Sequence, residues 1–298
     1  IEFRGTSYSV KKEGVIGVAD ILLSGLFRYP VKSMLGESLD ETALGEAGVP
    51  GDRHWAIRDE QRGGIRGGKK LPQLMRFGAA SGAGAPAITS PDGETKSASD
   101  DDINAWLSAK LAHPVSLWPL LPKEQLEHYR RGPPDDEDFE AELRAVFGRL
   151  PHEPIPDLTP FIEVLEYESP PGTYFDAFPL MVMSKQSLAT MQKNNPASRF
   201  DTRRFRPNLL IDCVGDEHPF PEQQWVGKQL RIGEVILDIA YTCPRCSMVT
   251  QPLDELPQDT GIMRALVEQA EGNLGVYARV IHPGSVSVGD YVSVDFEV

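Results

Sequence analysis

Short strand-like runs, separated by turns that contain glycine or proline, recur from Ile21 almost to the end of the chain. Each run spans roughly seven or eight residues, a length typical of the strands of small closed barrels. Glycine and proline both interrupt strands and favour turns, and the sequence contains 27 glycines and 25 prolines. The pattern therefore predicts a mainly β protein with a few short helices, an α+β fold built from β-barrels.

The individual elements can be placed by their periodicity and by the residues that end them. A Pro-Asp-Gly turn at 91–93 predicts a hairpin, and apolar residues at helical spacing predict a helix over 101–112. Further strands are expected at 21–30, at 54–60, at 204–215, twice within 225–246 and twice within 273–296, and further helices at 136–148, 185–192 and 261–272.

Residues 121–160 differ from the rest of the chain because they mix acidic residues with prolines. We interpret this stretch as an inserted connection between two domains, one over 21–120 and one over 161–298. A surface excursion without a role is the alternative interpretation.

The charge balance is acidic and excludes some classes of partner. The sequence holds 30 Lys and Arg against 44 Asp and Glu, a net charge of −14 at pH 7. Nucleic acids and anionic membranes bind basic surfaces, so neither is an expected partner. No apolar run approaches the roughly 20 residues of a transmembrane helix, and the first residues lack the apolar core of a secretion signal. Three cysteines are too few for a disulfide scaffold, so we expect a cytoplasmic location.

The segment Thr242-Cys243-Pro244-Arg245-Cys246-Ser247 carries the most chemical information. A zinc half-site would need two more ligands, and Cys213 is the only other thiol. A thioredoxin-type pair would begin a helix, whereas β-like residues follow here. Two interpretations stay open. One is a pair of buried structural cysteines, and the other is a single thiolate ligand to a soft metal centre, with Arg245 lowering the pKa of the thiol.

Arg199, Arg203, Arg204 and Arg206 lie close together in an otherwise acidic chain. A guanidinium presents a planar fork of donors that suits phosphate. A solvated loop held by salt bridges is the alternative interpretation. The position of Arg206 favours phosphate binding, because Pro207 and an expected strand follow it and should make its backbone rigid.

A second basic group lies near the start of the chain. Lys32 and Ser33 leave the first expected strand at a turn, so both side chains could face one ligand, and Arg53 follows a Gly-Asp turn. Together these residues suit a phosphate, although each pattern is also common in structural roles. The Gly-rich sequence of a P-loop does not precede Lys32.

Taken in order, several segments resemble those of MOSC-domain proteins: YPVKS at 29–33, GDRHWAI at 51–57, FPLMVMSKQSL at 178–188, RRFRPNLLI at 203–211 and CPRCSMVTQ at 243–251. The resemblance is to the group with an N-terminal MOSC β-barrel domain, similar to the mitochondrial amidoxime-reducing component and its bacterial relatives. It implies that the first domain is this smaller β-barrel and that the second is the MOSC β-barrel.

The resemblance also implies a molybdenum cofactor, a phosphate-bearing pterin whose dithiolene holds molybdenum. Cys246 would be the catalytic residue and the protein's thiolate ligand to the metal. Cys243 should not be a ligand, because residues three apart in a strand face opposite sides. The residues that match cofactor-binding positions of the family are Lys32, Ser33, Arg53, Ala177, Phe178, Arg206, Asn208, Arg245 and Tyr277.

The activity implied by the resemblance is the reduction of N-hydroxylated compounds by oxygen-atom transfer. The chain shows neither the ferredoxin-like domain nor the membrane anchor of some relatives, so a separate protein is the expected electron donor. Pyridoxal phosphate binding is associated with the family only in general terms, and no domain for it is expected here. Two alternatives stay open: a carrier of the molybdenum cofactor, or of sulfur on Cys246, without turnover, and a barrel that serves only as an interaction module.

Overall fold

A large sheet dominates the fold in the computed structural model, which describes residues 21–134, 136–161 and 166–295. Its strands are β1 (Ile21–Arg28), β2 (Glu37–Leu39), β9 (Leu180–Ser184), β10 (Leu209–Cys213), β11 (Gln229–Ile232), β12 (Val235–Pro244), β13 (Asn273–His282) and β15 (Val292–Asp295). Their order is β15-β11-β12-β13-β9-β10-β1-β2. Neighbours are antiparallel except for β9 and β10, which run parallel.

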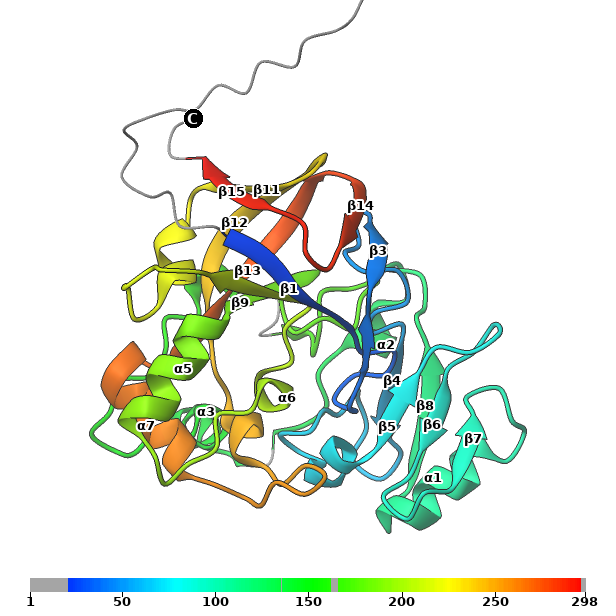
Figure 1. Ribbon diagram of the computed structural model, residues 1–298. Helices are drawn as coiled ribbons and strands as arrows, with labels where there is room; N and C mark the ends of the chain where they lie inside the picture. The colour runs from blue at the N-terminus through cyan, green and yellow to red at the C-terminus, as the bar shows by residue number, and fades with distance from the viewer. Residues whose placement is uncertain (1–20, 135, 162–165, 296–298) are drawn as a thin grey trace, which may run out of the picture.

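The sheet curls until β1 meets the last part of the chain (Figure 1). The Leu23 N–H donates to the Asp290 carbonyl at 2.9 Å, and the Gly289 N–H donates to the Leu23 carbonyl at 2.7 Å. Beside this junction, β3 (Glu41–Leu44) pairs with β14 (Gly284–Ser287). The expected closed β-barrel is therefore confirmed, and β1, from the first part of the chain, is one of its strands.

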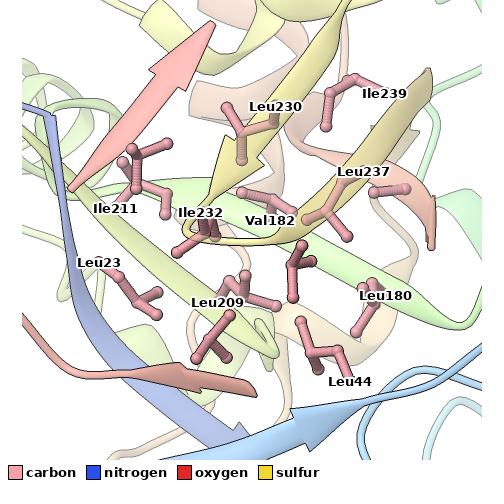
Figure 2. Close-up of a cluster of buried hydrophobic side chains, with 14 of the residues drawn as sticks. Leu23, Leu44, Leu180, Val182, Leu209, Ile211, Leu230, Ile232, Leu237 and Ile239 are labelled. Carbon is pink, nitrogen blue, oxygen red and sulfur yellow. The ribbon is translucent and has the colours of Figure 1, made fainter. Parts of the chain in front are cut away.

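Apolar side chains from these strands fill the barrel (Figure 2). Alternate residues point inward, so that Val235, Leu237 and Ile239 of β12 are fully buried, whereas Ile236 and Asp238 between them are not. Burial of each such aliphatic side chain stabilises the fold by about 1.5–3 kcal/mol. The interior is a packed core, so a ligand site must lie outside it.

A smaller unit packs beside the barrel around a core of its own. The hairpin predicted at the Pro-Asp-Gly turn and the helix predicted over 101–112 are both found there. The elements of this unit are β4 (Trp55–Asp59) paired with β8 (Val115–Pro119), the three-stranded sheet of β5 (Gly78–Ala80), β6 (Ala87–Thr89) and β7 (Thr95–Ser97), the 3₁₀ helix η1 (Pro72–Arg76) and helix α1 (Ile103–Leu111).

The remaining helices lie outside the barrel (Figure 1). They are α2 (Leu126–Tyr129), α3 (Phe139–Phe147), α5 (Lys185–Asn194), α6 (Thr202–Phe205) and α7 (Gly261–Ala270), with 3₁₀ turns η2 (Thr159–Phe161), η3 (Pro221–Trp225) and η4 (Ser247–Thr250). In the described part of the chain, no helix is both long enough and apolar enough to cross a membrane. The cytoplasmic location and the absence of nucleic-acid and membrane partners stay predictions.

Two strand expectations were wrong in detail. The strand expected over 204–215 is only Leu209–Cys213, because Asp201 accepts the Arg203 N–H at 3.0 Å and starts helix α6 instead. Arg206 then takes the left-handed conformation, with φ of 58°, and turns the chain. The two strands expected over 273–296 are three, β13, β14 and β15, and position 296 lies outside the described residues.

A carboxyl group is buried between η3 and the start of α5. Oε2 of Glu222 accepts hydrogen bonds from the hydroxyls of Ser184, at 2.5 Å, and Ser187, at 2.6 Å. Oε1 is buried without a hydrogen-bond partner among the described residues. Burial raises the pKa of this carboxyl above its ordinary value of 4.5, because the charged form loses its hydration.

Because folding raises the pKa of Glu222, the protonated carboxyl contributes to stability below pH 4.5. This contribution is lost as the pH rises through the pKa of Glu222 in the folded state. We therefore expect the free energy of unfolding to decline as the pH rises from 4.5 through the neutral range. The Glu222→Gln variant, which cannot ionise, should decline less. Urea unfolding across this range measures both slopes, and equal slopes would contradict the assignment.

Candidate functional site

A narrow cavity of about 50 Å³ lies where the loops leading into β9 and β10 meet the end of β12. Segments from both halves of the chain contribute to its wall. Seven of the residues predicted from the sequence lie in this wall: Arg53, Phe178, Arg206, Asn208, Arg245, Cys246 and Tyr277.

Arg206 presents a buried and incompletely bonded cation to this cavity. Its guanidinium lies 4.2 Å from the centre of the Tyr29 ring, and Nη1 donates to the Met34 carbonyl. Nη2 is buried and has no hydrogen-bond partner among the described residues. Burial, followed by the charge of Arg53, lowers the pKa of Arg206 to about 10. An anion would complete both the charge balance and the missing hydrogen bond.

The Arg206 carbonyl and the Asn208 side chain both accept hydrogen bonds from Arg53 and hold it beside Arg206. Arg53 forms an ion pair with the buried Asp52 carboxylate and donates to Asn208 Oδ1 at 3.3 Å. Asn208 Oδ1 also accepts the Met181 N–H at 3.2 Å, which anchors it to β9. Arg53 and Arg206 both adopt the left-handed conformation, with φ of 54° and 58°. Such strain is concentrated at functional sites, which favours a binding role for this pair.

Arg245 adds a third guanidinium from the end of β12. Nη1 donates to Cys243 Sγ at 3.0 Å, and Nη2 donates to the Phe205 carbonyl at 2.7 Å. Nε is buried without a hydrogen-bond partner among the described residues. The cavity wall therefore holds four guanidinium groups, because Arg204 lines it as well. Nε of Arg204, Nη2 of Arg206 and Nε of Arg245 have no hydrogen-bond partner among the described residues.

A wider chamber of about 290 Å³ meets the narrow cavity. Asp176, Pro244, Cys246 and Tyr277 line both spaces. Helix α3 forms one side of the chamber, and the predicted residue Ala177 lies in its wall. The two cavities thus share a junction, with a thiol and a carboxylate at it.

Cys246 is half-buried at this junction, whereas Cys243 is buried and lines only the narrow cavity. The argument from strand alternation was wrong, because β12 ends at Pro244 and the parity does not extend to Cys246. The expectation that the pKa of the Cys246 thiol is lowered overall was also wrong. Burial raises the pKa of Cys246 by more than the charges of Lys69 and then Arg245 lower it.

Lys32 and Ser33 lie outside the walls of both cavities. The Lys32 ammonium donates to Asp176 Oδ1 at 2.8 Å, to the Tyr174 carbonyl at 3.0 Å and to Ser169 Oγ at 3.3 Å. Desolvation opposes ionisation of the cavity-facing Asp176, but the charge and hydrogen bond of Lys32, together with the charges of Lys69 and Arg53, hold the Asp176 pKa below its usual range. Lys32 therefore positions a carboxylate at the junction.

The arginine cluster divides into residues with different surroundings. Arg204 is fully buried and donates to three backbone carbonyls at 2.7–3.2 Å. Arg203 forms ion pairs with Asp201 and Glu255 at 2.9 and 2.6 Å. For Arg203, the alternative interpretation of a guanidinium held by salt bridges is therefore correct, whereas Arg206 faces the cavity.

Sequence reasoning missed Lys69 and Asp176, which both lie in the chamber wall. Lys69 Nζ is 3.2 Å from Glu168 Oε1. Burial acts to lower the Lys69 pKa, but the charge of Glu168, together with the smaller contributions of Cys246 and Asp176, raises it above its ordinary value. The Gly-Gly-Lys-Lys turn at 67–70 is the sequence signal that could have identified Lys69.

Family models match two stretches of the sequence. Residues 21–98 match the MOSC N-terminal beta barrel domain, and residues 171–293 match the MOSC domain. The chain belongs to the MOSC-domain family. The stretch matched to the MOSC domain forms most of the large barrel, whereas the stretch matched to the N-terminal domain begins in β1 and β2 of that barrel and continues into the smaller unit. The domain boundaries at 21–120 and 161–298 stay predictions.

Two curated relatives match most of this MOSC chain. Mitochondrial amidoxime reducing component 2 of Bos taurus is 26% identical over 91% of this chain and 82% of its own length. A molybdenum cofactor sulfurase of Oryza sativa subsp. japonica is 24% identical over 82% of this chain, which spans only 29% of that relative. The solved YuaD protein from Bacillus subtilis aligns with 92% of this chain and 94% of its own, with 13% identity and a TM-score of 0.42.

The raised pKa of Cys246 predicts slow alkylation at neutral pH. Its rate with iodoacetamide should rise with pH to a midpoint above the ordinary thiol value of 9.0. In a Lys69→Met variant the midpoint should move higher, because a charge that favours the thiolate is lost. Lys70→Met, which removes the neighbouring lysine paired with Glu142, serves as the control. Peptide mass spectrometry identifies the modified residue, and an unchanged midpoint in Lys69→Met would refute the coupling.

Proposed function

We propose that this MOSC protein is a molybdenum-cofactor-dependent oxidoreductase that reduces N-hydroxylated compounds, such as amidoximes. The observation that carries the proposal is the position of the Cys246 thiol, where a cation-lined cavity meets a wider chamber. Similarity to the bovine amidoxime reducing component, over most of both chains, supports the same function.

The donor set of the narrow cavity fits an anionic cofactor with a metal held by sulfur. Unused donors on Arg206 and Arg245 suit a phosphate, and Arg53 adds positive charge. Within the described residues, no three His, Cys, Asp or Glu side chains cluster to hold a metal alone. The protein would therefore contribute one soft thiolate, from Cys246, and the cofactor would bring the other metal ligands.

When bound, the cofactor would supply two-electron oxygen-atom transfer. Because the two cavities share wall residues, the cofactor would not need to fit within the narrower one. The residues that we propose hold it are Arg53, Arg206, Asn208 and Arg245, with Ala177, Phe178 and Tyr277 beside it. Lys32 would act through Asp176, and Ser33 through Met248.

The overall reaction determines what the chain's own residues must do. Reduction of an amidoxime to the amidinium ion and water consumes two electrons and three protons, of which this chain would deliver one and the solvent the others. A separate donor protein would provide the electrons. The Lys69 ammonium, kept charged by Glu168, would deliver a proton from Nζ to the departing oxygen. The ionised Asp176 carboxylate would stabilise the amidinium charge of the product.

A pair of cysteine variants tests the metal ligand. Cys246→Ser should abolish reduction of benzamidoxime by the loaded protein with a chemical reductant as donor, whereas Cys243→Ser should keep most of the activity. Metal and pterin analysis of each protein provides the control for loading. Parent-level turnover by a fully loaded Cys246→Ser protein would disprove the ligand assignment.

The second candidate is a carrier that holds sulfur on Cys246, or the molybdenum cofactor, and passes it on. Similarity to the rice molybdenum cofactor sulfurase favours it. A persulfide on Cys246, detected as one added sulfur in the intact mass of protein without metal, would support the carrier. Stable molybdenum together with amidoxime reduction would support the oxidoreductase.

The anion site predicts different outcomes for two nearby arginines. Arg206→Ala should lower pterin and molybdenum content, because a charge-assisted hydrogen bond is worth about 1.5–3 kcal/mol, or roughly ten- to a hundredfold in affinity. Arg203→Ala, which removes an exposed ion-paired guanidinium, should leave both contents unchanged. Equal loading of Arg206→Ala and the parent would rule out Arg206 as a cofactor ligand.

A further inference from the structure

A buried arginine of the connection over 121–160 lines neither cavity, and the proposed function gives it no role. Arg149 follows the glycine that ends helix α3, and it is only 7% exposed. Nη2 donates to the Glu271 carbonyl at 3.3 Å, whereas Nε is buried without a hydrogen-bond partner among the described residues. Burial lowers the pKa of Arg149, because the charged form loses its hydration. A guanidinium is rarely buried with so little compensation, so its place at the end of α7 needs an explanation.

The turn that ends helix α7 has a conformation that fits this guanidinium. Glu271 and Gly272 are both left-handed, with φ of 53° and 79°, and both N–H groups donate to the Leu266 carbonyl. A Cβ on residue 272 would lie 2.6 Å from Arg149 Cζ, so a side chain there would collide with the guanidinium. The cation also complements the negative end of the helix dipole. Arg149 and the glycine of this turn therefore fit each other.

The same turn holds the backbone that carries the candidate ligands. The Gly272 carbonyl accepts the Arg245 N–H at 2.8 Å, and Asn273 pairs with Pro244 at the end of β12. Because Pro244 has no N–H to donate, the Arg245 N–H fastens the chain to this turn directly before Cys246. Arg245 and Cys246 both line the narrow cavity. A displaced turn would therefore move both of them.

The loop that carries Arg149 is anchored to α7 by a second arginine, which reaches in the opposite direction. Arg264 of α7 forms an ion pair with Glu153 and donates to the Gly148 carbonyl. Glu153 also accepts the Leu150 N–H at 2.7 Å, which ties the loop to itself. The loop is thus fixed against the side of α7 and presents Arg149 to the end of that helix.

We propose that Arg149 is a positioning residue, which fixes Arg245 and Cys246 by holding the turn that accepts the Arg245 N–H. The connection over 121–160 would thereby support the anion site and the thiol from outside both cavities. The inference rests on the roles proposed for Arg245 and Cys246, but it does not require reductase activity. A surface excursion without a role would have no such effect.

Hydrogen exchange of the Arg245 amide, followed by NMR in the full-length chain, tests the proposal. Arg149→Met should speed this exchange roughly three- to tenfold, because the hydrogen bond to Gly272 loosens. Iodoacetamide should also modify Cys246 faster at one fixed pH. Arg149→Lys should restore much of the protection, since an ammonium can still donate to the Glu271 carbonyl.

Arg130→Met provides the matched control. It removes an arginine from the same connection, and therefore the same charge, but Arg130 is 45% exposed and pairs with Glu127 and Glu166. Exchange at Arg245 and modification of Cys246 should both stay at the parent rates.

A substitution on the other side of the contact tests the fit between the two residues. Gly272→Ala places a methyl group where the guanidinium lies and should speed Arg245 exchange in the parent. The same substitution should add much less in the Arg149→Met background, because the guanidinium that it displaces is already absent. Equal increments in the two backgrounds would show that the contact does not position Arg245.

The outcomes separate this inference from the proposed function. Arg149-dependent protection of Arg245 without amidoxime turnover by the loaded parent would remove the reductase function and leave the positioning role standing. Unchanged exchange at Arg245 in folded Arg149→Met would overturn the positioning role, whether or not the parent turns over. Equal acceleration by Arg130→Met, or along the whole of β12 and β13, would overturn it as well. Melting temperatures show which variants fold, and Arg149→Lys and Gly272→Ala decide the question if Arg149→Met does not.

Discussion

The Arg206 guanidinium, buried among other guanidinium groups around one cavity, is the costly feature on which the candidate site depends. Burial, followed by the charge of Arg53, outweighs its favourable contacts and lowers its pKa to about 10. Arg53 and Arg245 differ, because the negatively polarised groups around each of them together outweigh desolvation and raise the pKa. The packed barrel core supplies the stability that offsets the burial of Arg206, and its strand ends keep the loops that carry the three residues from separating. An anion at the unused donor of Arg206 would offset this cost.

Local sequence patterns were enough to predict the element types and the barrel. Apolar alternation located most strands, and the order of the CPRC and RFRPN segments identified the family. Patterns within single segments could not reveal α6, where the Asp201 cap overrides an apparent strand, nor the use of the Lys32 ammonium for Ser169, Tyr174 and Asp176. Asp176 and Lys69 were not predicted as site residues, because they reach the site only through contacts between segments distant in sequence.

Different parts of the chain line the two cavities of the candidate site. Residues of the barrel ends line the narrow, cationic space, whereas the connection over 121–160 contributes a wall of the wider one. Cys246 belongs to both. In this arrangement the part that would bind the cofactor is tied to the barrel core, while residues of 121–160 border the space beside Cys246.

The closure of the barrel through β1 has a consequence for the order of events during synthesis. Strand β1 is among the first parts of the described chain to leave the ribosome, and β2 pairs with only its last residues. Its other partners, β10 and the turn at Gly289 and Asp290, are synthesised much later. The elements around the small core, including β4 and β8, are complete by residue 119, whereas most of β1 keeps unpaired backbone groups until its later partners are made. Such a waiting strand edge is prone to aggregation. Because Arg53 lies in the first part of the chain and Arg206 and Arg245 in the last part, a cofactor that contacts all three would be acquired only after the chain has been synthesised through Arg245.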